Sequence, residues 1–190
     1  MDTPSAADPD PTSDIPYPDR APHHRDDLPA RGPGAPAPWG LRATARTIDL
    51  VVVLVPATLL AEAFGVRRDD DGLLVGPMWP RLIFPLLFIA YELVTTGVVR
   101  RSVGKFLCRV TVVQWATGAA PTPNQGLVRG TVAGIWFLLA LIGGVLGYLV
   151  FVPVVVYLTS IADSLYRGVH DKAAGTIVLA DPLRGRVRPD

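Results

Sequence analysis

The chain has 190 residues, of which 49% are hydrophobic, with a mean hydropathy of +0.34 and a formal net charge of +1 at pH 7. This balanced charge gives no reason to expect nucleic-acid binding, and the single cysteine, Cys108, excludes an intramolecular disulfide. The averages hide a contrast, since residues 1–40 are polar whereas most of 41–165 is strongly apolar. The sequence therefore predicts an integral membrane protein.

The first 40 residues combine Pro, Asp, Ala and Gly with almost no large apolar side chains. Such a segment cannot bury enough surface to offset the entropy of ordering it, so we expect a disordered cytoplasmic tail over 1–40. The stretch "MDTPSAADPDPTSD" has neither a basic start nor an apolar run, so we expect no cleavable secretory signal. Insertion would then depend on the internal apolar segments.

Two apolar segments are long enough to cross a bilayer as helices. The first covers about residues 41–64 and ends at Gly65 and the charged "RRDDDG". The second covers about 79–99, where Trp79 and Arg81 are placed to anchor it at the interface.

A different pattern follows the second segment. The run "CRVTVVQ" alternates over a few residues, and a second β-branched run, "GTIVLA", occupies residues 175–180. Short alternation favours a strand over a spanning helix, so we expect the two runs to pair as a small two-stranded element on one membrane face. The basic residues near both runs place that face in the cytoplasm.

The apolar stretch 127–166 is too long for one crossing, because a single helix of that length would reach about 60 Å. We therefore divide it near "IGGVLG" into helices over 127–143 and 146–165, followed by a basic tail over 182–190. The loop 100–129 and the C-terminal tail are both rich in Arg and Lys, which requires an even number of crossings between them. The predicted fold is an all-α, four-helix transmembrane bundle over 41–181, in the plasma membrane with both termini cytoplasmic.

Charged residues at membrane depth need partners or a function, since each costs about 2.5–3.5 kcal/mol in the hydrocarbon. Arg46 and Asp49 are spaced i, i+3 on one face of the first helix, so we expect them to pair toward the bundle interior. Such a pair is consistent with an ion- or proton-linked site, or with a structural role that fixes helix orientation; from the residues alone the structural role is favoured.

Further candidates lie along the chain. Glu92 sits near the middle of the second helix with no neighbouring base, and a bond from Arg46 or Arg129 would satisfy it. Asp163 closes the last predicted helix, where an ordinary hydrated position is equally consistent with the sequence. His170 and Asp171 follow just outside the bilayer, and a surface turn is favoured there over a proton relay.

Enzyme motifs are not found in the sequence. The "SVGKFL" stretch lacks the upstream glycine, the strand and the Ser or Thr of a phosphate-binding loop. The chain also carries no nucleophile elbow, no dinucleotide fingerprint and no array of metal ligands. We therefore expect a protein that is not an enzyme and has no cofactor and no metal.

Several motifs in the right order resemble the RDD family of small membrane proteins. "LRATARTIDLVVV" is similar to the family's first helix, with Arg46 and Asp49 at its arginine and first aspartate. "RRSVGKFLCRVTVV" resembles its Gly-Lys loop, through Gly104 and Lys105, and Arg129 fits a basic residue at the start of the next helix. The closing motif is matched by "GVHDKAAGTIVLA", which supplies His170, Asp171, Gly175 and Thr176.

The resemblance implies that Arg46, Asp49 and Asp171 form one constellation, with Asp171 favoured over Asp163 as the second family aspartate. For the group it implies transport of ions or other ligands, and our hypothesis for this chain is transport of a cation, proton or small ligand through a site built on Arg46, Asp49 and Glu92. The alternative is a non-catalytic scaffold whose charges are structural. The expected partners are the lipid bilayer and either a second copy or other membrane proteins, without nucleic acid.

Overall fold

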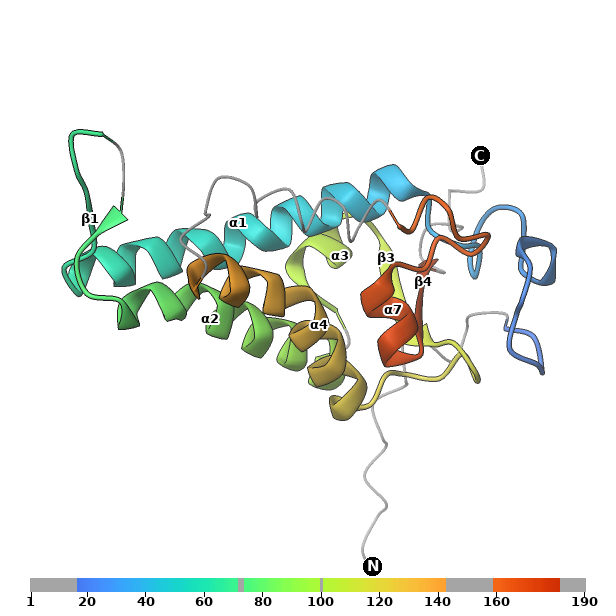
Figure 1. Ribbon diagram of the computed structural model, residues 1–190. Helices are drawn as coiled ribbons and strands as arrows, with labels where there is room; N and C mark the ends of the chain where they lie inside the picture. Colours follow the sequence, from blue (N-terminus) through green and yellow to red (C-terminus); the bar gives the residue numbers. More distant parts are fainter. Residues whose placement is uncertain (1–16, 72–73, 100, 143–158, 182–190) are drawn as a thin grey trace, which may run out of the picture.

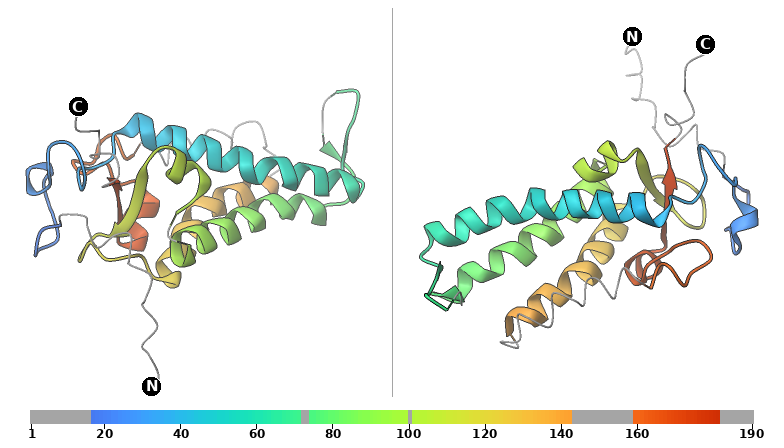
Figure 2. Two further views of the ribbon diagram at one scale, coloured as in Figure 1. Left: turned by 180° about the vertical axis from the view of Figure 1, so that it is seen from behind. Right: turned by 90° about the horizontal axis from the view of Figure 1, so that it is seen from above.

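The computed structural model describes residues 17–71, 74–99, 101–142 and 159–181. Three long helical segments run beside one another, as Figures 1 and 2 show. A small sheet, β3–β4, and the short helix α7 lie at one end of these helices, and a two-residue hairpin, β1–β2, lies at the other.

Helix α1 covers Trp39–Ala63, close to the predicted 41–64. The second segment begins as a 3₁₀ turn, η2, over Trp79–Leu82, continues as α2 over Ile83–Glu92 and ends as a π-helix, η3, over Leu93–Val98. Both segments, Trp39–Ala63 and Trp79–Val98, are long and apolar enough to cross a membrane, and only 28% of the apolar window of each is buried. Two helices that expose so much apolar surface are suited to contact with lipid.

Helix α4 covers Pro123–Ile142 and starts four residues before the predicted 127. It packs closely against η3, because a Cβ on Gly126 would lie 2.9 Å from the backbone nitrogen of Gly97. This close approach brings the first turns of α4 against the end of the second membrane segment.

The predicted two-stranded element is present. Strand β3 (Val110–Gln114) pairs antiparallel with β4 (Thr176–Ala180), with Val110 opposite Ala180 and Gln114 opposite Thr176. Helix α3 (Val103–Leu107) precedes β3, and α7 (Val169–Ala174) leads into β4 through Gly175, whose φ of 64° is the left-handed conformation that ends many helices. The β1–β2 hairpin, Arg67–Arg68 paired with Leu74–Val75, was not predicted.

The prediction of a disordered tail over 1–40 is wrong for residues 17–40. The chain there forms a 3₁₀ turn, η1 (Arg25–Asp27), and Leu28 is buried in a core with Leu165 and Ile177. Pro36 forms a β-bridge with Leu179, and the Tyr17 hydroxyl donates a 2.6 Å hydrogen bond to the carbonyl of Trp115. The few apolar residues of this polar segment are sufficient because the sheet supplies the rest of the core. Residues 1–16 and the basic tail 182–190 lie outside the described residues.

The fourth predicted helix, 146–165, lies mostly outside the described residues. Its last part, 159–165, forms turns and bends instead of helix. In this part of the chain the Asp163 carboxylate accepts backbone hydrogen bonds from Leu165 and Arg167, at 3.2 and 2.9 Å. Such local bonds from an Asp side chain favour a turn over a continued helix.

The docking of the N-terminal segment is testable through Leu28, which is 5% exposed. We expect Leu28→Ala to lower the free energy of unfolding by about 2–5 kcal/mol, because it leaves a cavity beside the sheet. Thermal unfolding of the purified chain in detergent measures the change. The matched control is Asp26→Ala at an exposed neighbouring position, and equal midpoints for the two variants would contradict the packing.

Candidate functional site

The candidate site is a cluster of buried charges between the helices and the β3–β4 sheet. At its centre the Glu92 carboxylate, which is fully buried, contacts three cationic groups from three different helices. It accepts hydrogen bonds from Arg46 Nη1 of α1 at 2.9 Å, Arg129 Nε of α4 at 2.8 Å and Lys105 Nζ of α3 at 3.2 Å. The Thr96 hydroxyl, in the π-helix, adds a fourth bond at 3.1 Å.

Arg129 joins Glu92 to a second buried carboxylate. Its Nη1 donates to Asp171 of α7 and, at 2.9 Å, to the hydroxyl of Thr176 at the start of β4. Arg42 of α1 also pairs with Asp171, and the backbone N–H of Gly168 donates to that carboxylate at 3.2 Å. The cluster therefore ties α1, α2 and α4 to the sheet end of the molecule.

Asp49 is satisfied differently, and the expected Arg46–Asp49 ion pair is not formed in the described structure. Its carboxylate accepts bonds from the Tyr91 hydroxyl at 2.8 Å, the Ser102 hydroxyl at 2.6 Å and the Gly104 backbone N–H at 2.8 Å. Arg46 reaches Glu92 instead, with its guanidinium 5.2 Å from the centre of the Phe88 ring. A shared helix face placed both residues toward the interior, but the neighbouring helices determine their partners.

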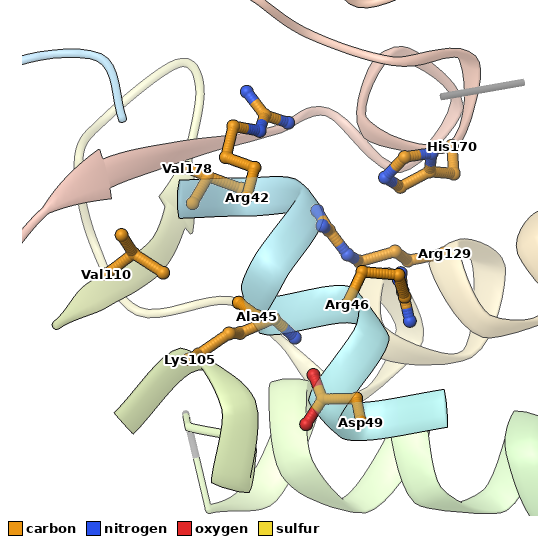
Figure 3. A pocket seen from close by; sticks show the side chains of 9 residues that line it. All are labelled: Arg42, Ala45, Arg46, Asp49, Lys105, Val110, Arg129, His170 and Val178. Carbon is orange, nitrogen blue, oxygen red and sulfur yellow. The ribbon is translucent and has the colours of Figure 1, made fainter. Parts of the chain in front are cut away.

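A small cavity of about 20 Å³ opens beside these residues, which is room for about one water molecule. Figure 3 shows the side chains of α1, α3 and α4 converging on it, with Val110 and Val178 of the two strands at its apolar side. The polar and charged side chains that line it are Arg42, Arg46, Asp49, Lys105, Arg129 and His170.

Burial and nearby charge set the protonation of the groups outside the membrane segments. Burial lowers the pKa of His170 to about 3, against the opposing effect of Asp171, so the imidazole is neutral at pH 7. Burial raises the pKa of the Asp171 carboxyl, but Arg129, His170 and Arg42 outweigh it and hold that pKa well below its usual value. Burial lowers the pKa of Lys105, and contact with Glu92 opposes that effect.

A family model described as the RDD family matches residues 36–175. The chain belongs to the RDD family. No curated protein and no solved structure matches it.

The structure brings together most of the predicted site residues of this RDD protein. Arg46, Asp49 and Asp171 all lie in the cluster, at 7%, 1% and 0% exposure. Glu92 and Arg129, proposed separately from the sequence, connect Arg46 to Asp171, and Asp49 lines the same cavity. Four of the motif residues also contribute: Gly104 through its N–H, Lys105 and Thr176 through their side chains, and His170 at the cavity.

Asp163 lies outside the cluster. Its carboxylate pairs with Lys172 at 2.9 Å and with Arg167 at 3.6 Å, at the turn between residue 159 and α7. The structure thus places Asp171, and not Asp163, beside Arg46 and its neighbours. His170 and Asp171 are fully buried, so the favoured surface turn is wrong for this pair.

Arg42 and Ser102 belong to the cluster but were not predicted from the sequence. Arg42 precedes Arg46 by four residues and Asp49 by seven, so the same helical periodicity could have placed it on this face. Ser102 caps α3 by accepting from the Lys105 backbone N–H at 3.3 Å, while its hydroxyl donates to Asp49. Serine is a preferred capping residue, so "SVGK" carried a signal for a helix start.

The chemistry available to this site is limited by its composition. Among the described residues no group of three or more His, Cys, Asp and Glu side chains is arranged to hold a metal ion. The carboxylates are occupied by arginine, lysine, hydroxyl and amide donors. The arrangement is suited to holding elements together and to attracting negative charge.

The contact of α3 with α1 is testable at Gly104, where a Cβ would lie 1.9 Å from the carbonyl oxygen of Ala45. We expect Gly104→Ala to push α3 away from α1 and to break the bonds that reach Asp49. The melting midpoint in detergent should fall, together with the amount of protein in the membrane. Gly40→Ala is the matched control, because its Cβ meets nothing within 4 Å. A Gly104→Ala protein as stable as the Gly40→Ala protein would refute the contact.

Proposed function

We propose that this RDD protein is a non-catalytic membrane scaffold in which the charge cluster is structural. The observation that carries the proposal is the full burial of Glu92 in contact with Arg46, Lys105 and Arg129. A carboxylate surrounded in this way joins three helices through strong, charge-assisted hydrogen bonds. It holds the membrane segments and the sheet in one fixed arrangement.

The same contacts argue against a cation moving through Glu92. A metal ion would have to displace at least one of three cationic groups from the carboxylate and would be repelled by the others. Removing the carboxylate from these partners would leave buried charges uncompensated, which costs several kcal/mol per ion.

The surface for partner binding would be the exposed apolar side of α1. Val51, Val55 and Leu59 are 53%, 53% and 62% exposed and follow one another at helical spacing. Within a bilayer such a face contacts lipid or the helices of another protein. The partner would be a second copy of this chain or another protein of the plasma membrane. In this proposal the sheet and both termini lie on the cytoplasmic side, because basic residues are concentrated in the loop 100–129 and in the C-terminal tail.

Proton- or ligand-linked transport is the second candidate, and one observation favours it. Asp49 lines the cavity, and its three hydrogen-bond donors, Tyr91, Ser102 and Gly104, are uncharged groups. A ligand in the cavity could therefore reach this carboxylate without breaking an ion pair.

The structural proposal is tested with Glu92→Gln, which keeps the size of the side chain and removes its charge. We expect the protein to accumulate poorly and its melting midpoint in detergent to fall, since breaking a buried ion pair costs about 3–5 kcal/mol. Adding Lys105→Met should restore part of the loss, because one buried cation is removed with its partner charge. Glu62→Gln, at an exposed site of α1, is the control. A Glu92→Gln protein with unchanged stability would contradict the structural role.

The transport candidate is tested by pH-linked cation flux in vesicles that contain the purified chain. If Asp49 carries protons, the parent protein gives flux and Asp49→Asn abolishes it while accumulating normally. The scaffold proposal expects no flux from either protein. If the parent protein gives flux, and Asp49→Asn abolishes it while accumulating normally, the scaffold proposal is wrong and the transport proposal is supported.

A further inference from the structure

The cavity in Figure 3 is surrounded by more positive than negative charge. Four basic side chains line it, and the carboxylates in contact with the cluster are those of Asp49, Glu92 and Asp171. Within the described residues the cluster therefore has an excess of one positive charge, since His170 is neutral at pH 7. Four cationic groups share three carboxylates, so the field of the cluster at the cavity is positive and attracts an anion.

The place of the cavity along α1 identifies where such an anion would come from. Trp39 opens the helix at 39% exposure, and Arg42 and Ala45, which line the cavity, follow within its first two turns. A tryptophan at the start of a span marks the headgroup region of the bilayer.

Helix α3 also indicates that the cavity lies at the depth of the lipid headgroups. It lies against Ala45 and Asp49 through Gly104 and exposes Val103, Phe106 and Leu107 at 46%, 62% and 61%. A short helix with a polar side turned inward and a large apolar side exposed is suited to the boundary between headgroups and hydrocarbon. The cavity is thus level with the phosphates of the lipids.

We propose that this cavity is a binding site for a phosphate-type oxyanion, contributed either by an anionic lipid headgroup or by free phosphate. Arginine guanidinium groups present planar pairs of N–H donors that match phosphate oxygens, and Arg42, Arg46 and Arg129 all face this space. A volume of about 20 Å³ admits one oxygen of the group, and the remaining oxygens stay in the opening of the cavity. Binding neutralises the excess charge and strengthens the link between α1, α4 and the sheet.

The test measures thermal unfolding of the full chain in detergent while sodium phosphate is added at constant ionic strength. A saturable rise of the melting midpoint is expected, because a ligand that binds only the folded state stabilises it by mass action. A second arm places the chain in phosphatidylcholine bilayers with and without phosphatidic acid. Stabilisation by phosphatidic acid at near-equimolar lipid, with little effect of phosphate, identifies a headgroup; the reverse identifies free phosphate.

Two variants tie the effect to the cavity. Arg42→Gln removes one cation, and Val178→Met fills space at the apolar wall without removing charge. Either should weaken the apparent affinity by at least about tenfold, as expected for a lost charge-assisted bond or a blocked site. Arg31→Gln, an exposed arginine in the N-terminal segment, is the control and should bind as the parent does. If Arg42→Gln fails to fold, the apparent affinity of the Val178→Met protein for phosphate or phosphatidic acid tests the site by itself.

A parent protein that neither phosphate nor phosphatidic acid stabilises would overturn the proposal, and so would folded cavity variants that respond as the parent does. This outcome is separate from that of the scaffold proposal. The scaffold depends on the stability lost in Glu92→Gln, whereas the anion site depends on a shift that phosphate or phosphatidic acid produces in the parent.

Discussion

The contact of Arg129 with two buried carboxylates holds the rest of the structure in place. Its Nε binds Glu92 in the second membrane segment, and its Nη1 binds Asp171 in α7. One guanidinium thereby connects the membrane helices with the sheet, because its donors diverge in a fixed plane. Lysine has a single charged nitrogen and could not span the two carboxylates with the same geometry.

The buried charges of the cluster are compensated only when all its members are present. Glu92 needs its basic neighbours to offset its burial, and each of those residues is itself at most 8% exposed at its side chain. The cost of leaving any member alone explains why residues from α1, α2, α3, α4 and α7 share one site. In such a network the balance of charge over the whole group matters as well as the geometry of each member, which links the structural role to the proposed binding of an anion.

The sequence predicted several local features correctly and the connections between them less well. Alternation identified β3 and a β-branched run identified β4, and apolar length identified α1 and the segment from Trp79, because these signals are local. The bonds from Arg46 and Arg129 to Glu92 were among the expected partners and are present. The expected Arg46–Asp49 pair was wrong, since helix spacing specifies a face but not the residue opposite it. The low apolar content of the N-terminal segment by itself predicts disorder. Its core, around Leu28, is completed by residues near the C-terminus, which no local pattern reveals.

The pairing of Arg42 with Asp171 joins residues 129 positions apart. During synthesis the first helix must therefore enter the translocation machinery long before its acidic partner has left the ribosome. Arg42 is without this counter-charge throughout that interval, and the native arrangement can form only after translation of α7 is finished. A nascent chain truncated before residue 171 would consequently lack this link between the first helix and the sheet, whatever the length of its apolar segments.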